Sequence, residues 1–551
     1  MNFYDEVEDI TKKLVSISSV NKAPGEETAV AEYIYDFYGN LPYFKEHPQR
    51  RILQKTEDDF LERHNALSFV KGTKDGGSPR TVILLGHIDT VGVEDFGDYS
   101  SYATKADKLP EILKKHFDLS EEVLQDIDSQ RYLFGRGALD MKAGVAGHMA
   151  IIKYFSENPH LLKGNLIALH ECDEEDNSKG VITGLDLLVE LREQEGFEYI
   201  ACINADYSTN HSPGDTSCYI YYGSIGKLLP CCSVFGKEAH VGQPFAAFDP
   251  NFLSAVITKN ISLNPRLCDL AQGELTVPPI SLKQSDLKPE YTVQTALHAL
   301  SYYNIFSHGK SPLEVLGSVK EIVDESYDEA LELLSSRYKE YCALANIEHT
   351  PLPWKKALYT WEELYSEVKA YNPNFDEELN RFKNKLHSEN PAMDLRLYSH
   401  EVVRFTWSRR KVNSPGVVLY FASVYSARIE MTGRTEKERD LLSAVEKSID
   451  KVRPTADREL KTRYFYPYIS DSSFMAICDG PEAIDGLGRN MPSWGKKYTH
   501  PTDKILQINV PVVNIGSFGK DGHMLTERVD KKQTFDNVPA ITTGTILALL
   551  D

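Results

Sequence analysis

The chain has 551 residues, which is too long for a single hydrophobic core, so we expect two or three folded units. Its 61 basic and 81 acidic residues give a net charge of −20, which opposes binding to a nucleic-acid backbone or an anionic membrane. The acidic amino terminus lacks the features of a secretory signal, no apolar run reaches membrane-spanning length, and the eight cysteines do not resemble a disulfide framework. These features indicate a cytoplasmic protein that binds neither nucleic acid nor membrane.

Four short apolar runs predict strands that are buried on both faces of an α/β sheet. Helical spacing precedes them in residues 4–38 and lies between some of them, as in residues 142–155 and 184–194. This alternation predicts a mostly parallel sheet, and the ligands of such sheets collect beyond the carboxyl ends of the strands. Each run is followed by residues of the kinds that bind metals. The four runs are Thr81–Gly86, Asn165–Leu169, Tyr199–Ile203 and Val510–Ile515.

The sequence changes in texture between residues 212 and 451, where two strand-like segments flank a long helix-rich stretch. Amphipathic helical spacing with many charges covers residues 313–345 and 361–386. We therefore predict a discontinuous α/β catalytic domain, with its first part at 1–211 and its second part at 452–551. Residues 212–451 would form an inserted α+β domain that carries an extra helical insertion.

The first two motifs combine a histidine, two aspartates and several glycines. Gly-His87-Ile-Asp89 ends the first strand, although a strand-end histidine is more often simply hydrogen-bonded. In Gly-Arg-Gly-Ala-Leu-Asp140-Met-Lys-Ala-Gly, the glycines permit tight turns and the aspartate precedes a helix. This segment departs from the phosphate-loop pattern, because no Gly-Lys-Ser/Thr follows four variable residues, and from the dinucleotide pattern, because its third glycine is wrongly spaced.

Acidic residues follow the second strand as Asp-Glu174-Glu175-Asp, where carboxylates repel one another unless a cation offsets their charge. A calcium loop would need a twelve-residue ligand pattern with a central glycine, which is absent, whereas a solvated acidic turn remains an alternative. Asp206 follows the third strand, and His523 lies in a late loop. Together, two histidines and several carboxylates on five loops form the mixed ligand set that suits zinc or similar divalent ions.

In their order and surroundings these motifs resemble the di-zinc metallopeptidase and amidohydrolase family of clan MH, which includes aminoacylases, acetylornithine deacetylase, succinyl-diaminopimelate desuccinylase and glutamate carboxypeptidase. Within it the chain looks most like the branch named for arginine utilisation in bacteria. The resemblance implies a phosphorylase/hydrolase-like catalytic domain and a lid and dimerisation domain at 212–451, although the helical insertion exceeds the usual family core. The matching segments are Gly-His87-x-Asp89, Gly-x-Gly-x-x-Asp140, Asp-Glu174-Glu175, Asp206, His523-x-x-x-Glu527, Gly25-Glu-Glu and Gly236–Pro244.

The resemblance implies two divalent metal ions, taken to be zinc, with cobalt or manganese as alternatives. Asp140 would bridge both ions. His87 and Asp206 would complete one site, and Glu175 and His523 would complete the other. Five side chains would therefore hold two ions, all of them imidazole or carboxylate ligands, which the residue types by themselves already favour.

Four further residues receive roles from the resemblance. Glu174 would be the general base that takes a proton from the water between the metals and later returns it to the leaving amine. Asp89 would orient the ring of His87. His240, in the inserted domain, would reach into the site of a neighbouring subunit and help to bind the oxyanion, which implies a homodimer, unless it is an ordinary surface histidine. Arg428 falls near the family arginine that anchors a substrate carboxylate.

The expected reaction is hydrolysis of an amide or peptide bond in a small peptide or N-acyl amino acid, with a link to arginine or other amino-acid catabolism by resemblance only. Asp206-Tyr-Ser departs from the Glu-Pro-Thr of many carboxypeptidase and deacylase members and is closer to the aminopeptidases and dipeptidases. Two rival hypotheses remain. One is a catalytically silent member that binds or regulates, and the other is a hydrolase of a different bond such as a phosphoester, which no Arg or Lys cluster beside the ligands favours.

Overall fold

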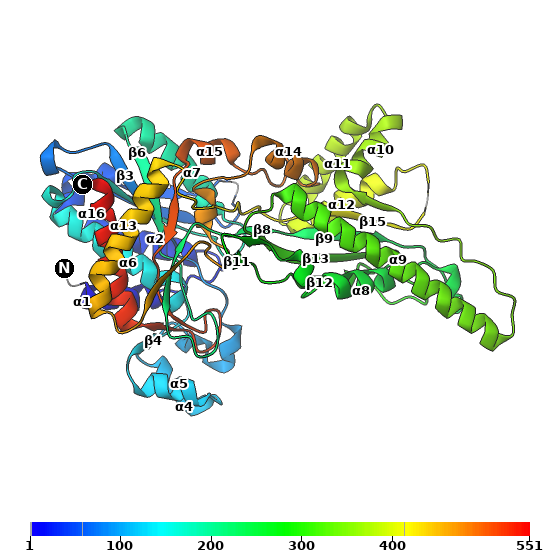
Figure 1. Ribbon diagram of the computed structural model, residues 1–551, viewed down its shortest axis with the longest axis horizontal. Helices are drawn as coiled ribbons and strands as arrows, with labels where there is room; N and C mark the ends of the chain where they lie inside the picture. The colour runs from blue at the N-terminus through cyan, green and yellow to red at the C-terminus, as the bar shows by residue number, and fades with distance from the viewer. Residues whose placement is uncertain (1–2, 58, 413) are drawn as a thin grey trace. The chain divides into compact units, whose positions relative to one another are not determined.

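The computed structural model describes residues 3–57, 59–412 and 414–551. The chain folds into two compact units, whose helices and strands are labelled in Figure 1. Three segments of the chain build the first unit and two build the second. Unit 1 comprises Met1–Ile225, Ile429–Cys478 and Pro501–Asp551, and unit 2 comprises Gly226–Arg428 and Asp479–His500.

The edges of the two units differ from the predicted boundaries at residues 211 and 451. Strand β7 (Cys218–Tyr222) pairs with β16 and β17 and so joins the sheet of unit 1. Helix α13 (Glu436–Val452) packs on α16 (Val538–Leu550), which also belongs to unit 1. Residues 479–500, predicted to belong to the catalytic domain, are part of unit 2. Strand pairing and helix packing decide these memberships, and local composition reveals neither.

Unit 1 is built on an eight-stranded sheet whose central strands run parallel. Strands β5, β3, β6 and β17 are parallel neighbours, whereas β1 and β2 form an antiparallel edge. The four predicted apolar runs correspond to β3, β5, β6 and β17, so the predicted α/β class with a mostly parallel sheet is confirmed. In sheet order the strands are β1 (Arg51–Lys55), β2 (His64–Lys71), β5 (Asn165–Glu171), β3 (Arg80–His87), β6 (Glu198–Asn204), β17 (Val512–Asn514), β7 and β16 (Leu460–Arg463).

Helices cover both faces of this sheet, which explains why its central strands are apolar without alternation. Val82 and Leu84 of β3 belong to one hydrophobic cluster with residues of α1, α2, α6, α13 and α16. On the opposite face, Leu169 of β5 closely approaches Gly184 of α7, which also contacts α15. Figure 1 shows α1, α6, α13 and α16 together on one side of unit 1. Further helices of unit 1 are α1 (Tyr4–Val15), α2 (Glu26–Gly39), α3 (Pro42–Glu46), α6 (Ala143–Glu157), α7 (Lys179–Glu195) and α15 (Thr502–Ile508).

A smaller three-stranded sheet supports a late loop of unit 1. Strands β18 and β19 form a hairpin whose tip contains His523, and β19 pairs with β4. Strand β4 leads into the glycine-rich turn that carries Asp140, so this sheet brings two predicted ligands to the same region. The elements are β4 (Tyr132–Phe134), β18 (Gly519–Lys520) and β19 (Arg528–Asp530), beside the short helices α4 (Leu109–His116) and α5 (Glu121–Asp128).

Unit 2 is a separate α+β layer with a largely antiparallel sheet. Residues of β9 and β15, such as Cys231 and Val418, pack with α10, α11 and α12 in one core. Helix α8 contacts β9, β12 and β13 and packs along α9. In sheet order the strands are β12 (Ile280–Asp286), β13 (His298–Ser307), β9 (Pro230–Phe235), β15 (Gly416–Phe421) and β14 (Leu358–Thr360), with β8 (Gly226–Leu228) on β13 and a hairpin of β10 (Leu270–Ala271) and β11 (Glu274–Leu275). The helices are α8 (Pro250–Ile261), α9 (Pro312–Ala345), α10 (Trp361–Tyr371), α11 (Phe375–Glu389), α12 (Leu395–Trp407) and α14 (Pro481–Arg489).

The helical insertion of unit 2 is clearest in α9, whose 34 residues begin at a capping box formed by Ser311 and Glu314. The predicted helical stretch 313–345 is therefore confirmed. The stretch 361–386 is instead two helices, α10 and α11, which are separated around Pro373. Proline explains the break, because it offers no backbone N–H and disfavours the helical conformation of the residue before it.

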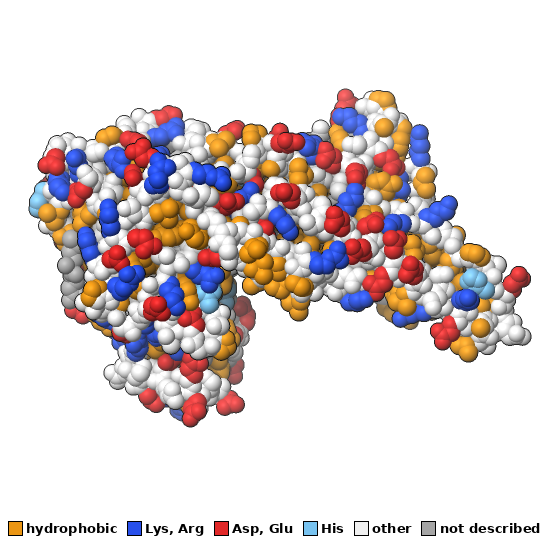
Figure 2. Space-filling model, in the orientation of Figure 1, with side chains coloured by type: hydrophobic (Ala, Val, Ile, Leu, Met, Phe, Trp, Pro, Cys, Tyr) orange, Lys and Arg blue, Asp and Glu red, His pale blue; other side chains and the backbone are white. Residues whose placement is uncertain are grey.

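Charges of both signs are interspersed on the face drawn in Figure 2, with small apolar areas between them. On this face the acidic side chains therefore do not collect into a single patch. Among the helices that the structure describes, none is both long and apolar enough to span a membrane.

Candidate metal centre

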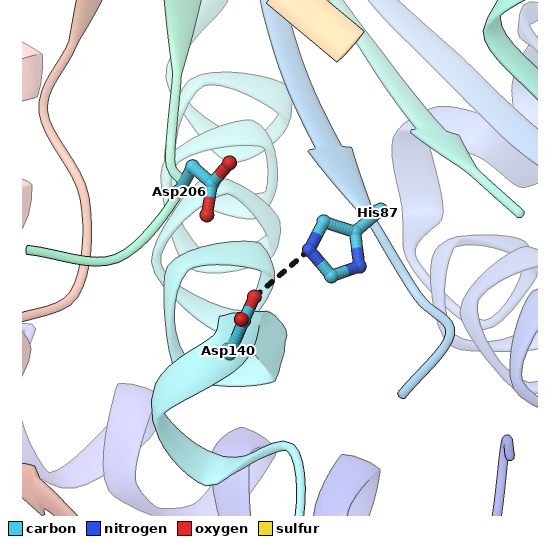
Figure 3. Close-up of side chains that lie close together, drawn as sticks. All are labelled: His87, Asp140 and Asp206. Atoms are coloured by element: carbon cyan, nitrogen blue, oxygen red, sulfur yellow. Dashed lines mark hydrogen bonds and ion pairs between the residues drawn. The ribbon is translucent and has the colours of Figure 1, made fainter. Parts of the chain in front are cut away.

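The ends of β3 and β6 and the turn before α6 bring three predicted ligands together. His87 is the last residue of β3, Asp206 lies two residues beyond β6, and Asp140 lies three residues before α6. Their ligand atoms all lie within 4.8 Å of one another (Figure 3). His87 Nε2 lies 3.0 Å from Asp140 Oδ1, and all three side chains are buried. We call this group the first triad.

A second triad shares Asp140 and adds two residues from other loops. Glu175 follows β5 in the acidic turn, and His523 lies at the tip of the β18–β19 hairpin. His523 Nε2 lies 2.8 Å from Asp140 Oδ2 and 2.8 Å from Glu175 Oε1, and the three ligand atoms lie within 4.8 Å of one another. Asp140 thus directs one carboxylate oxygen to the histidine of each triad, which is the arrangement that a bridging ligand requires.

The turn that carries Asp140 is held by Glu527. Glu527 Oε1 accepts hydrogen bonds from the backbone N–H groups of Leu139, at 3.0 Å, and Asp140, at 3.2 Å. Its Oε2 pairs with Arg136 Nη1 at 2.9 Å, and both side chains are almost fully buried. Gly137 has a φ of 74°, so the turn requires a glycine there. The motif His523-x-x-x-Glu527 therefore supplies both a proposed ligand, His523, and the residue that supports Asp140, Glu527.

Asp89 lies between His87 and the acidic turn. Its Oδ1 is 3.4 Å from His87 Nδ1, and its backbone carbonyl oxygen is slightly closer, at 3.2 Å. The same carboxylate accepts hydrogen bonds from the backbone N–H groups of Glu174, at 3.2 Å, and Glu175, at 3.1 Å, and from the side-chain amide of Asn21, at 2.9 Å. These contacts fit the orienting role that the resemblance implies, and they extend it from the histidine ring to the acidic turn.

Burial and charge repulsion set the acidity of the centre. Burial, followed by the charge of Asp140, raises the pKa of Asp206 to about 7. Burial also raises the pKa of Glu174 well above its ordinary value. Burial opposes ionisation of Asp140 as well, but hydrogen bonds to His523 and His87 outweigh it and lower the pKa of Asp140. These buried acids cannot all ionise together unless positive charge is added. A bound cation would supply that charge, so the group has the electrostatics of a cation site.

The donor set of both triads fits divalent cations. Each triad offers one imidazole nitrogen and two carboxylate oxygens, a mixture that zinc, cobalt and manganese accept. Burial opposes protonation of His523, but its contacts with Asp140 and Glu175 outweigh burial and raise its pKa to about 10. The carboxylates therefore attract positive charge strongly, and a cation that replaced this proton would release it, because a protonated imidazole cannot bind a metal.

Two predicted residues, His240 and Arg428, belong to unit 2 and to neither triad. His240 is exposed in the loop before α8, where its Nδ1 accepts a hydrogen bond from the backbone of Gly242 at 3.1 Å. Arg428 is buried, and its Nη2 lies 3.1 Å from Asp479 Oδ1. The Tyr425 hydroxyl donates to the same carboxylate. Arg428 therefore has an acidic partner 51 residues away that the sequence did not reveal, and the roles of both residues stay predictions.

Sequence reasoning did not single out the residues that support the acidic turn from behind. Asn21 Nδ2 donates to Asp89 at 2.9 Å and to Asp173 at 3.2 Å, and Arg63 Nη1 lies 2.5 Å from Asp173 Oδ1. An asparagine in a loop and an arginine before a strand are common, so no local signal marks either residue. Their role becomes visible only when loop, strand and turn meet in the fold.

The sequence is similar to known proteins along nearly its whole length. The sequence pattern of peptidase family M20/M25/M40 matches residues 83–508. Protein RocB of Bacillus subtilis (strain 168) is 34% identical over 550 residues, covering 100% of this chain and 96% of RocB. The uncharacterised protein YqjN of the same organism is 31% identical over 553 residues, covering 99% of this chain and 96% of YqjN.

Solved structures share the fold. The M20 family metallo-carboxypeptidase Sso-CP2 from Sulfolobus solfataricus matches with a TM-score of 0.54 at 10% identity, over 99% of this chain and 100% of that chain. Aminopeptidase PepT from Bacillus cereus ATCC 10987 matches with a TM-score of 0.50 at 11% identity, over 100% of both chains. The family match and the full-length relatives show that the chain belongs to peptidase family M20/M25/M40, a family of metal-dependent hydrolases, and the two triads that share Asp140 are consistent with it.

Proposed function

We propose that the protein uses two divalent metal ions to hydrolyse an amide or peptide bond in a small peptide or N-acyl amino acid. The geometry of Asp140 carries the proposal, because its two oxygens face His87 and His523 separately. His87 and Asp206 would complete one ion site, and Glu175 and His523 the other. Zinc is the proposed ion, with cobalt or manganese as alternatives. The chemistry that such ions supply when bound is polarisation of the scissile carbonyl and a lower pKa of the attacking water.

Glu174 is the proposed general base. It precedes Glu175 in the acidic turn, its Oε2 lies 4.0 Å from His87 Nε2, and burial raises its pKa. A carboxylate with a raised pKa takes a proton from the attacking water more readily, and the resulting acid returns that proton to the leaving amine. Asp89 is the proposed positioning residue, since it accepts the backbone N–H of Glu174 and contacts the ring of His87.

The proposal extends to unit 2 as a lid and dimerisation domain of a cytoplasmic homodimer, with unit 1 as the catalytic domain. His240 would donate a hydrogen bond to the oxyanion in the neighbouring subunit, a role for which its exposure leaves the imidazole available. Arg428 would anchor a substrate carboxylate, with Asp479 holding one edge of its guanidinium in place.

For the substrate, the full-length similarity to RocB supports the branch suggested by the sequence motifs. On that ground we propose a role in arginine or other amino-acid catabolism. Asp206-Tyr-Ser favours small peptides, because this segment is closer to the aminopeptidase and dipeptidase members. A catalytically silent, binding or regulatory protein is the alternative, against which the presence of Glu174 beside all five proposed ligands weighs.

Elemental analysis, together with amine release from a pooled set of dipeptides and N-acyl amino acids, tests the proposal. We expect about two divalent ions per chain in the wild type, fewer in His87→Ala, and amine release abolished in Glu174→Gln with the ions retained. Asp176→Asn is the matched control, because Asp176 lies in the same turn, pairs with Lys22 at 3.1 Å and belongs to neither triad. A wild type that binds no metal after zinc supplementation and cleaves nothing would contradict the proposal and favour the binding or regulatory alternative.

A further inference from the structure

A buried cluster of ion pairs lies behind the acidic turn, and Arg63 is at its centre. Arg63 directly precedes β2, and its side chain is 6% exposed. Its Nη1 lies 2.5 Å from Asp173 Oδ1 and 3.4 Å from Glu27 Oε2, and its Nε lies 2.7 Å from Asp59 Oδ2. One guanidinium therefore contacts three buried carboxylates, none of which belongs to either triad.

Such a cluster is an expensive way to stabilise a fold. Burying charged groups contributes less to the free energy of folding than burying apolar groups of the same volume, unless every charge is paired in good geometry. Arginine meets that condition here because its planar fork presents several donors at once, and Asp59 accepts two of them. The cluster is better explained by the need to hold Asp173 in one position.

Asp173 is held on every side. Its backbone N–H donates to Glu27 Oε1 at 2.9 Å, and its Oδ1 accepts hydrogen bonds from Arg63 and from Asn21. Its Oδ2 accepts the backbone N–H of Lys179, the first residue of α7, at 3.1 Å. Its φ of 66° lies in the left-handed region, which aspartate adopts more readily than most residues with a side chain but which is still uncommon, and these contacts hold the backbone there.

Glu174, the proposed general base, and Glu175, a proposed ligand, directly follow Asp173 in the turn. Asp89 holds the backbone N–H groups of Glu174 and Glu175 from the side of the metal centre, while Arg63 holds the preceding residue from behind. A change in the backbone at Asp173 would therefore move Glu175 relative to its partner His523, 2.8 Å away. The first triad takes no residue from this turn and is linked to it through Asp89, which contacts His87, so we expect the first triad to be affected much less.

We propose that Arg63 is a positioning residue that places Glu175 for the ion of the second triad and thereby sets the affinity of that ion selectively. This inference rests on the proposed function, because it assumes that the two triads bind ions. It assigns Arg63 no contact with substrate or metal. Its action passes through Asp173 to the backbone of the turn.

Zinc titration of the full-length protein against a competing chelator, combined with elemental analysis, tests the inference. In Arg63→Met we expect one of the two ions to bind about 10–100-fold more weakly, while the affinity of the other changes much less. Arg63→Lys should recover part of the loss, because it keeps the charge but not the fork. Arg51→Met is the matched control, because Arg51 lies on β1, stacks over Tyr35 and donates to the carbonyl oxygen of Tyr35. This variant should bind both ions as the wild type does.

Asp173→Asn keeps the inference testable if Arg63→Met does not fold. Asparagine tolerates the left-handed backbone and keeps a hydrogen-bond acceptor, but it loses the ion pair with Arg63, so we expect the same selective loss of one ion. A wild type with two ions and variants with the same two affinities, or variants that lose both ions in parallel, would overturn the inference and leave the proposed function standing. A wild type that binds no ion would overturn both.

Discussion

Glu527 provides a quantitative test of how the shared aspartate is held. Its carboxylate accepts the backbone N–H groups of Leu139 and Asp140 and pairs with the buried Arg136. In Glu527→Ala, both N–H groups would lose their acceptor. Arg136 would keep the partly exposed Asp95, 2.8 Å away, and lose its buried partner.

The cost of this substitution can be worked from these contacts. Breaking a buried ion pair by removing one partner costs about 3–5 kcal/mol, and each buried donor without an acceptor costs about 1–3 kcal/mol. The retained contact with Asp95, and water entering the vacated space, offset part of this total. We therefore expect the free energy of unfolding to fall by about 4 kcal/mol in Glu527→Ala. Glu527→Gln keeps one acceptor oxygen and should lose about 2 kcal/mol.

Urea unfolding followed by circular dichroism measures these differences. Glu122→Ala is the control, because Glu122 is mostly exposed and its pair with Lys520 should be worth less than about 1 kcal/mol. A loss below about 1 kcal/mol in Glu527→Ala would refute the reasoning, since it would mean that the buried contacts of Glu527 are not made in solution.

Three further predictions follow from buried contacts and from the proposed centre. Burial lowers the pKa of His148 and His170 to about 3, so between about pH 6.5 and 3 the unfolded chain binds a proton at each that the folded chain does not. The free energy of unfolding should therefore fall with falling pH by about 1.4 kcal/mol per pH unit for each histidine, and His148→Gln should lose half of that slope in urea unfolding. Gly144→Ala should lower the melting temperature, because its Cβ would lie 2.1 Å from the carbonyl oxygen of Ala205, and an unchanged temperature in calorimetry would contradict this contact. Removing the ions with EDTA should lower the melting temperature and added zinc should restore it, whereas identical melting curves would count against an ordered metal centre.

Much of unit 1 could be predicted from local sequence. Strands β3 and β5 are buried on both faces, and that environment leaves a continuous apolar run in the chain. Candidate ligands stood out because each follows a strand or lies in a short glycine-rich or acidic motif, and the resemblance to the metallopeptidase family then assigned five of them to two ions. The amphipathic spacing of residues 313–345 predicts a helix for the same kind of reason, whereas the similar spacing of residues 361–386 runs across the break near Pro373 and hides it.

The tertiary structure decided what depends on contacts between distant segments. Whether β7 and α13 belong to unit 1 depends on strand pairing and helix packing, which composition does not encode. The partnership of Arg63 with Asp173 spans 110 residues, and that of Arg428 with Asp479 spans 51. The sequence by itself determined the fold class, the strand ends and the ligand types, because these follow from local burial and residue chemistry. Only the folded chain decided which buried charges meet, because a pair of opposite charges leaves no periodic or local trace until the elements that carry them are packed together.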